Sequence, residues 1–172
     1  AFDLPYLFDS PDSMYAYLNG EPGFRFGERL LDQGIKYLGS GFNGAQCFSN
    51  SVRPINNIED LQGLKIRVME NPIYIDTINA LGANATPMSW GELFTALQQK
   101  AVDGQTNTPS LTYLGGFHEV QDYYTLSDFC YSALVMIINN DFYESLPIDY
   151  QKAISDGAIK YLCEEQIALE IE

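Results

Sequence analysis

The stretch LKIRVMENP, residues 64–72, decides the fold class of this chain. Its first five residues alternate between apolar and polar side chains, and a period of two is typical of a β-strand. Asn71 is a candidate N-cap and Pro72 suits a first helical turn, so a helix is expected to follow at once. Arg67 lies near the carboxyl end of the strand, which is where open α/β sheets bind their ligands.

Strands and helices are expected to alternate on both sides of this stretch. Apolar spacing and turn residues predict helices from about Ser10 and over residues 23–34, 57–63, 71–82, 89–100, 140–147 and 149–172. Further strands are expected over residues 35–41, 45–50, 85–88, 101–107, 119–127 and 131–139. Such an alternation indicates an α/β fold.

Three finer expectations concern caps and packing. Ser89 and Glu92 have the spacing of a capping box at the start of the helix over residues 89–100. The run ALVMII, residues 133–138, reads as a buried strand. In the long C-terminal helix the spacing predicts one inward face, made of Tyr150, Ile154, Ala158, Tyr161 and Leu162.

Composition excludes some classes of function. The chain has 172 residues, with 9 Lys and Arg against 23 Asp and Glu, and a net charge of -14. This balance argues against a nucleic-acid partner and against an anionic membrane surface, because both require a basic face. The longest apolar run is far shorter than the ~20 residues that span a bilayer, so no direct membrane insertion is expected. An anionic ligand would have to be recognised locally, in a nearly dry site.

The two ends and the cysteines leave the cellular compartment open. The chain starts without Met and stops inside an apparent helix, so both ends look cut and a secretion signal can lie outside the given residues. The cysteines, Cys47, Cys130 and Cys163, are odd in number and widely spaced. They form no CxxC or other metal-binding spacing, and neither a metal nor a cofactor is expected.

No residue stands out as catalytic. His118 has no apparent nucleophile beside it and is more simply a surface or packing histidine. Asp103 belongs to an Asp-Gly pair that is typical of a turn, and Glu92 is better explained as a capping residue. The chain also lacks the glycine-rich and nucleophile motifs of phosphate-binding and hydrolytic sites.

Three side chains remain as candidate ligand contacts. On periodicity alone, Arg67 is a surface arginine of an edge strand, but its position and its forked geometry suit a carboxylate. Asn107 follows the Asp-Gly pair and is either a turn residue or a neutral partner for a carboxylate or hydroxyl group. Trp90 is more simply a core residue, although a side chain at the start of a helix can face both core and ligand.

Residues 60–107 resemble the substrate-binding proteins of tripartite ATP-independent periplasmic (TRAP) transporters, the DctP family. The resemblance rests on DLQGLKIR, LGANATPM, SWGELFTALQ and VDGQTN, which occur in the family's order and spacing. The segments RPINNIEDL, residues 53–61, and LPIDYQKAI, residues 146–154, also fit. The likeness therefore runs through nearly the whole chain.

The resemblance implies a periplasmic-binding-protein-like α/β fold, with two α/β lobes and a ligand cleft between them, incomplete here. Family chains are longer, so the N-terminal part and the C-terminal end are expected to be missing. Residues 1–40 would be the remainder of the first lobe and the crossover region. Residues 41–138 would be mainly the second lobe with the binding motifs, and residues 139–172 a C-terminal helical region that returns towards the first lobe.

The resemblance also implies a periplasmic receptor, not an enzyme, that captures a small organic acid and delivers it to TRAP permease subunits driven by an ion gradient. Arg67 would hold the ligand carboxylate and Asn107 would assist it, with Trp90 nearby. The family often carries a second arginine near the position of Gln46, so here that contact would be uncharged. A dicarboxylate, a sugar acid, a keto acid and an aromatic acid all remain open as ligands.

Two other readings remain. In one, the chain is a small α/β enzyme that uses Arg67 to orient a carboxylate substrate. In the other, it is a stable remnant that binds nothing. Turnover of an acid, as opposed to its stoichiometric retention, distinguishes the enzyme from the receptor.

Overall fold

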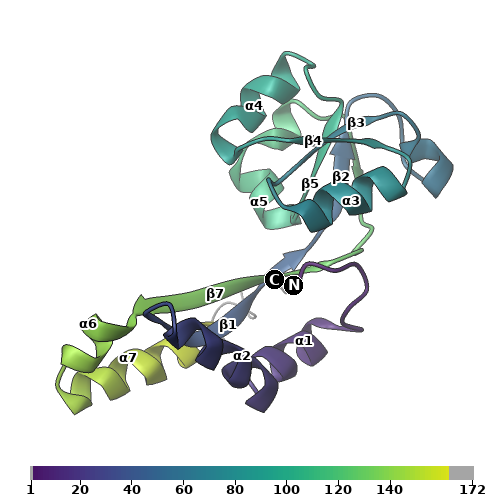
Figure 1. Cartoon of the computed structure of the whole chain (residues 1–172). Coiled ribbons are helices and arrows are strands. Elements are labelled where there is room, and N and C mark those ends of the chain that lie inside the picture. The colour runs from purple at the N-terminus through teal and green to yellow at the C-terminus, as the bar shows by residue number, and fades with distance from the viewer. Residues whose placement is uncertain (1, 163–172) are drawn as a thin grey trace. The chain divides into compact units, whose positions relative to one another are not determined.

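The structure is a computed structural model that describes residues 2–162 (Figure 1). The chain forms two compact units, and each is assembled from two separate segments. Unit 1 comprises Ala1–Leu7 and Gly44–Cys130, and unit 2 comprises Phe8–Asn43 and Tyr131–Glu172. Each unit has its own sheet and its own helices, so the two are described in turn.

Unit 1 is built on a five-stranded sheet with the order β4-β3-β5-β2-β6. Its strands are β2 (Cys47–Asn50), β3 (Lys65–Val68), β4 (Asn84–Pro87), β5 (Gly104–Asn107) and β6 (Tyr123–Thr125). β3 is parallel to β4 and β5, whereas β2 is antiparallel to β5 and β6. The α/β fold and the strand predicted in LKIRVMENP are both confirmed.

The helices of unit 1 follow its strands. They are η1 (Ile58–Leu61), α3 (Pro72–Ala80), α4 (Trp90–Gln98), α5 (Pro109–Leu114) and η2 (Phe117–Glu119). Asn71 caps α3 as predicted, because its Oδ1 accepts a hydrogen bond from the Ile73 N–H at 3.0 Å. Gly82, just beyond the end of α3, has a φ of +86°, which only glycine adopts without strain. Local sequence signals therefore set both ends of α3.

Separate apolar clusters cover the two faces of this sheet. α3 packs Tyr74 and Ile78 against Ile66 and Val68 of β3, and these four side chains are at most 1% exposed. On the other side, α4 and η2 pack around the fully buried Leu93. Figure 1 shows α3 and α4 on opposite sides of β3 and β4. Each large apolar side chain buried in this way contributes about 1.5–3 kcal/mol.

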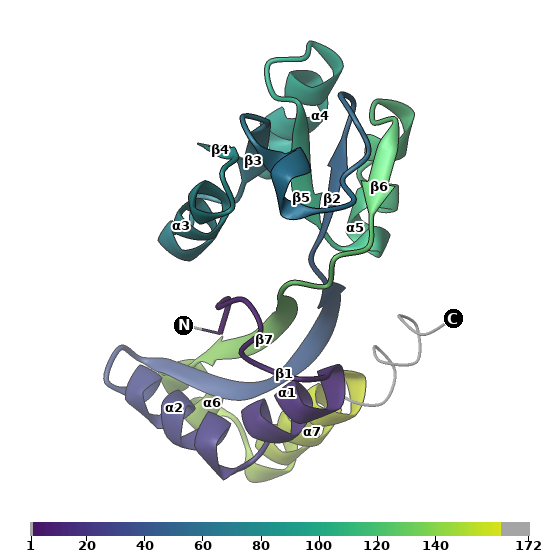
Figure 2. The same ribbon diagram turned by 90° about the vertical axis from the view of Figure 1, so that its right-hand side faces the viewer.

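The described part of unit 2, residues 8–43 and 131–162, combines two long strands with four helices. The strands are β1 (Ile35–Ala45) and β7 (Tyr131–Asn139), which pair with each other. The helices are α1 (Pro11–Leu18), α2 (Glu21–Leu31), α6 (Asn140–Ser145) and α7 (Ile148–Lys160). Figure 2 shows all four on the same side of the β1–β7 pair. A small core of Leu38, Tyr143 and Ala158 joins the strands to α6 and α7.

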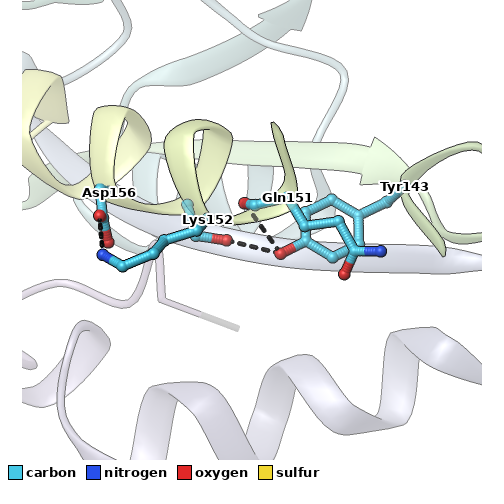
Figure 3. Close-up of polar contacts among 5 residues, drawn as sticks. Tyr143, Gln151, Lys152 and Asp156 are labelled. Carbon is cyan, nitrogen blue, oxygen red and sulfur yellow. Dashed lines mark hydrogen bonds and ion pairs between the residues drawn. The ribbon is translucent and has the colours of Figure 1, made fainter. Parts of the chain in front are cut away.

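Polar contacts fasten α6 to α7 (Figure 3). The Tyr143 hydroxyl donates to the Gln151 carbonyl oxygen at 3.1 Å and lies 2.8 Å from the Ser155 hydroxyl. Along α7, Lys152 and Asp156 form an ion pair one helical turn apart. Both of these side chains are mostly exposed, so the pair contributes little to stability. The contacts between α6 and α7 therefore depend on the Tyr143 hydroxyl, whereas the ion pair lies within α7.

The apolar run at residues 133–138 forms a strand as predicted, but its predicted burial is wrong. Val135 and Ile137 are each 52% exposed, whereas their neighbours Met136 and Ile138 pack against the core of unit 2. The helices cover only one side of the β1–β7 pair. Every second side chain of β7 therefore faces away from them.

Two finer expectations are corrected as well. Ser89 is the N-cap of α4, but its hydroxyl donates to the Glu92 carboxylate at 2.5 Å and does not accept from a backbone N–H, so the predicted capping box is absent. Of the inward face predicted for the C-terminal helix, Ala158 in α7 and Leu162 just beyond it are buried, whereas Tyr150 and Tyr161 are 63% and 54% exposed. The helix buries a narrower stripe than its spacing suggested. Cys163 and the rest of the expected C-terminal helix lie outside the described residues.

Candidate functional site

A pocket of about 240 Å³ in unit 1 lies at the carboxyl ends of β3 and β5. It is lined by Arg67, Met69, Glu70, Met88, Ser89, Trp90, Asn107 and Leu111. Three of the four side chains proposed from the sequence as ligand contacts are therefore brought together here. The fourth, Gln46, is not part of this wall.

Strand register explains why Arg67 and Asn107 meet. β3 and β5 are parallel neighbours in which Arg67 is opposite Gln105, so these two side chains share a face of the sheet. Asn107 lies two residues after Gln105 and therefore has the same orientation. This is the face opposite to the one that Ile66 and Val68 present to α3.

Arg67 is a buried cation held by one backbone carbonyl group. Its side chain is 2% exposed, and its Nε and Nη2 donate to the Met88 carbonyl oxygen at 3.0 and 2.8 Å. The remaining nitrogen, Nη1, is buried and has no hydrogen-bond partner among residues 2–162. A guanidinium has five N–H donors in a fixed plane, so this nitrogen is positioned to donate to a planar acceptor such as a carboxylate.

The charge of Arg67 is also uncompensated at short range. Within the described part of the chain, the guanidinium has no carboxylate oxygen within 4.0 Å. Burial lowers the pKa of Arg67, and the nearby Glu70 carboxylate opposes that shift. An arginine stays protonated in proteins, so the site holds a desolvated positive charge. A buried unpaired charge is costly for folding and is a feature of binding sites.

Asn107 forms the pocket wall at the end of β5. Its side chain is 6% exposed, and its Oδ1 accepts a hydrogen bond from the Thr108 N–H at 3.2 Å. Thr108 in turn caps α5, because its hydroxyl accepts from the Leu111 N–H at 3.3 Å. Because the Asn107 side-chain oxygen already accepts this local hydrogen bond, its amide nitrogen is the atom suited to donate to a ligand.

Trp90 belongs both to the core and to the pocket. Its ring packs edge-on against Phe117, with the ring centroids 5.0 Å apart, and Phe117 itself is buried. Trp90 is nevertheless 44% exposed and contributes to the pocket wall. A half-buried indole offers an apolar surface whose orientation is set by the core behind it.

Gln46 lies deeper than the sequence suggested. Its side chain is 1% exposed, and its backbone N–H donates to the Cys130 carbonyl oxygen at 2.8 Å. Its side-chain Oε1 has no hydrogen-bond partner in the described structure. Gln46 is adjacent to Cys47, which is the register partner of Asn107 in the neighbouring strand, so Gln46 lies near the end of β5 without lining the pocket.

Five wall residues were not proposed from the sequence as ligand contacts. Met88 supplies the carbonyl group that orients Arg67, and Glu70 supplies the one acidic side chain of the wall. Glu70 had a usable signal, since it follows Arg67 by three residues at the same strand end. Leu111 had no such signal in the sequence, because the helix that carries it, α5, was not predicted.

The other reactive side chains lie outside this pocket. His118 is exposed and stacks on Tyr113 with the ring centroids 4.9 Å apart. Asp103 accepts a hydrogen bond from the Lys65 N–H at 2.8 Å and so links β3 to the turn before β5. Within residues 2–162, no group of three His, Cys, Asp or Glu side chains could hold a metal ion. No helix in the same range has the length and apolar character needed to cross a bilayer.

The chain matches a known protein family. The family model described as "Bacterial extracellular solute-binding protein, family 7" matches residues 1–170. A protein of Verminephrobacter eiseniae, named "Solute-binding protein", is 38% identical over 156 residues. That alignment covers 91% of this chain and 47% of the relative.

Two solved structures show the same fold. One is a TRAP periplasmic solute-binding protein from Sulfitobacter sp. NAS-14.1 with bound β-D-galacturonate, with a TM-score of 0.89 and 34% identity over 94% of this chain and 54% of that one. The other is a TRAP periplasmic solute-binding protein from Shewanella oneidensis with bound succinate, with a TM-score of 0.86 and 34% identity over 94% of this chain and 52% of that one. The chain thus spans about half the length of the proteins it matches.

Proposed function

The chain belongs to the bacterial extracellular solute-binding proteins of family 7, and from that membership we propose that it is part of a periplasmic receptor that captures a small organic carboxylate. The receptor would deliver this ligand to the membrane permease of a TRAP transporter. The relatives that support this proposal carry a uronic acid in one case and succinate in the other. Both ligands present a carboxylate, which is the group that the pocket suits.

One observation carries the proposal: Arg67 is buried, yet its Nη1 has no hydrogen-bond partner in the described structure. A carboxylate oxygen at that nitrogen would satisfy the donor and neutralise the buried charge in one step. The gain is realised only when the ligand is present, so it appears as binding free energy. Removing one member of such a buried pair costs ~2–5 kcal/mol.

The other wall residues would position the rest of the ligand. The Asn107 amide nitrogen would donate to the same carboxylate or to a neighbouring hydroxyl group. Trp90 would pack against the C–H face of a sugar acid or the methylene groups of a shorter acid. These contacts would hold a ligand in place, as expected of a receptor.

We also propose that unit 1 is the lobe that carries the arginine and that unit 2 belongs to the other lobe. The sequence predicts lobe boundaries at residues 40 and 138, and the compact units meet at Asn43 and Cys130. All four positions lie on or beside β1 and β7. Separate sheets and separate cores in the two units support a receptor with two lobes.

The test uses the complete natural chain that contains these residues, with D-galacturonate and succinate as first probes. Binding should raise the apparent melting temperature, and calorimetry should show stoichiometric retention with no product formed. Arg67→Ala should weaken binding by at least ~30-fold, the equivalent of ~2 kcal/mol. Arg67→Lys should also weaken it, because a point charge cannot reproduce the fork.

Lys65→Ala is the matched control, since it removes one exposed positive charge from the same strand. It should change affinity less than about twofold, as expected for an exposed charge in water. If Arg67→Ala bound the acids as well as the natural chain does, the assignment of the site would be wrong. Turnover of either acid would favour the alternative in which the chain is part of an enzyme that uses Arg67 to orient a carboxylate substrate.

A further inference from the structure

The charge balance of the pocket wall bears on which acids the site accepts. Among the described residues that line it, only Arg67 and Glu70 carry charges, and their charges cancel. A ligand with one carboxylate would leave the site with a net charge of minus one. A ligand with two carboxylates would leave it at minus two, in a chain that is already strongly acidic.

Glu70 influences Arg67 without occupying its free nitrogen. The Glu70 carboxylate is close enough to act electrostatically on the Arg67 guanidinium. Yet no Arg67–Glu70 ion pair within 4.0 Å occurs in the described structure, so Nη1 is left for another acceptor. Glu70 is exposed, and it follows the last residue of β3 by two positions. It therefore adds a fixed negative charge to the wall.

From this arrangement we propose that Glu70 is a specificity-determining residue, which makes the site prefer acids with a single carboxylate over dicarboxylates of the same length. The inference rests on the proposed function, because it takes Arg67 as the anchor of the first carboxylate. With that end fixed, a second carboxylate in the same small pocket approaches Glu70. Like charges a few ångströms apart repel each other even in water.

The rest of the wall offers no compensation for a second negative charge. Met69, Met88, Trp90 and Leu111 are apolar. Ser89 and Asn107 are polar but uncharged, and the Ser89 hydroxyl already donates to Glu92. Hydroxyl groups and C–H surfaces suit such a wall better than a second carboxylate does.

The solved relatives show that the number of carboxylates on the bound ligand differs within the family. The Sulfitobacter protein was solved with β-D-galacturonate, which has one carboxylate, and the Shewanella protein with succinate, which has two. Family membership by itself therefore leaves the number of ligand carboxylates open. The residue at position 70 supplies a local physical reason for one outcome in this chain.

The experiment compares acids that differ only at one end. In each pair a hydroxymethyl group replaces one carboxylate: D-gluconate with D-glucarate, D-galactonate with galactarate, and γ-hydroxybutyrate with succinate. Dissociation constants are measured by calorimetry for the complete natural chain and for Glu70→Gln. Two further variants are Glu59→Gln, which makes the same charge change at an exposed residue outside the pocket, and Arg67→Ala.

In every pair that binds, we expect the dissociation constant of the monocarboxylate to be about fivefold or more lower than that of the dicarboxylate. This ratio corresponds to ~1 kcal/mol of repulsion. Glu70→Gln should reduce the preference about fivefold, mainly by tightening the dicarboxylate. Glu59→Gln should leave the ratio within about twofold, because its charge is distant and screened.

Three results separate the inference from the function it rests on. If the acids bind and Arg67→Ala abolishes binding, but dicarboxylates bind as well as their partners, the role of Glu70 is overturned and the receptor assignment stands. The same holds if Glu70→Gln leaves the ratio unchanged. If neither D-galacturonate nor any acid of the three pairs binds, or if Arg67→Ala does not weaken the binding that is seen, the proposed function falls and the inference falls with it.

Discussion

Arg67 is held in place before any ligand arrives. Two of its nitrogens share the Met88 carbonyl oxygen, and the Met88 N–H donates to the Val68 carbonyl oxygen at 3.1 Å. Met88, whose carbonyl group orients the guanidinium, is thus tied by its own N–H to the strand that carries Arg67. Such pre-organisation lowers the entropic cost of binding, because the side chain does not have to be immobilised by the ligand.

Asn107 can be tested by changing a donor into an acceptor. Asn107→Asp keeps an oxygen that can accept from the Thr108 N–H, but it places a negative charge beside the proposed carboxylate. It should weaken D-galacturonate binding by about tenfold more than Asn107→Ala does, because like charges repel in a desolvated site. Calorimetry on both variants gives the comparison. If Asp is tolerated and Ala is not, Asn107 acts only through the turn.

Cys130 predicts how the stability of the protein depends on alkaline pH. The side chain is 2% exposed, its sulfur lies 3.9 Å from the Tyr74 hydroxyl, and burial raises the pKa of Cys130 to about 11 from its ordinary value of 9.0. The unfolded chain releases this proton near pH 9, whereas the folded chain retains it until about pH 11. Ionisation of Cys130 therefore favours unfolding as the pH rises within that window, and its contribution is constant outside it.

Urea denaturation from about pH 8 to about pH 11 measures this effect. The free energy of unfolding should fall by roughly 2 kcal/mol more for the natural chain than for Cys130→Ser, whose hydroxyl does not ionise in this range. Parallel pH profiles for the two proteins would show that the thiol does not contribute.

At the scale of elements, the approach of β5 to β2 depends on a residue without a side chain. A Cβ atom at Gly104 would lie 2.1 Å from the Ser49 carbonyl oxygen, and that backbone atom belongs to the paired strand. Gly104→Ala should therefore force the strands apart and destabilise the protein by ~1–3 kcal/mol or more. The displaced β5 carries Asn107, so affinity should fall as well.

Gly91 provides the matched control for this substitution. It lies in α4, and a Cβ atom there would meet nothing within 4 Å. Gly91→Ala should stabilise the protein by ~0.5–1 kcal/mol, because alanine loses less backbone entropy in a helix. Urea denaturation of the two variants should give opposite signs. A neutral Gly104→Ala would mean that β2 and β5 are less closely held than the structure indicates.

At the scale of the whole molecule, the net charge of the chain and the charge of the Arg67 side chain have opposite signs. The net charge of -14 repels an organic anion at long range, whereas the buried Arg67 attracts it only at close approach. Raising the ionic strength from about 10 mM to about 150 mM shortens the screening length to about 8 Å. The association rate of D-galacturonate should then rise, by about twofold.

Stopped-flow fluorescence can follow this association. The dissociation rate should change much less, since the proposed ion pair is buried and poorly reached by salt. An association rate that fell with added salt would show that the local field of the arginine outweighs the charge of the whole molecule.

The sequence alone predicted those features that depend on neighbours along the chain. The strand at LKIRVMENP, the Asn71 cap and the α/β class all follow from local alternation and backbone preference. Arg67 could be proposed as an anchor because the carboxyl end of a strand is a general place for ligands. Its resemblance to a known family then suggested what kind of ligand to expect.

Only the tertiary structure decided which side chains share a wall. It brought the Met88 carbonyl group and Leu111 to the same pocket as Arg67, buried Gln46 outside the pocket wall, and left half of β7 exposed. These outcomes depend on which helices cover which face of a sheet and on contacts between residues far apart in the chain. Periodicity along the sequence predicts whether a side chain faces an apolar or a polar environment. Which residues it contacts there depends on how the helices and strands pack.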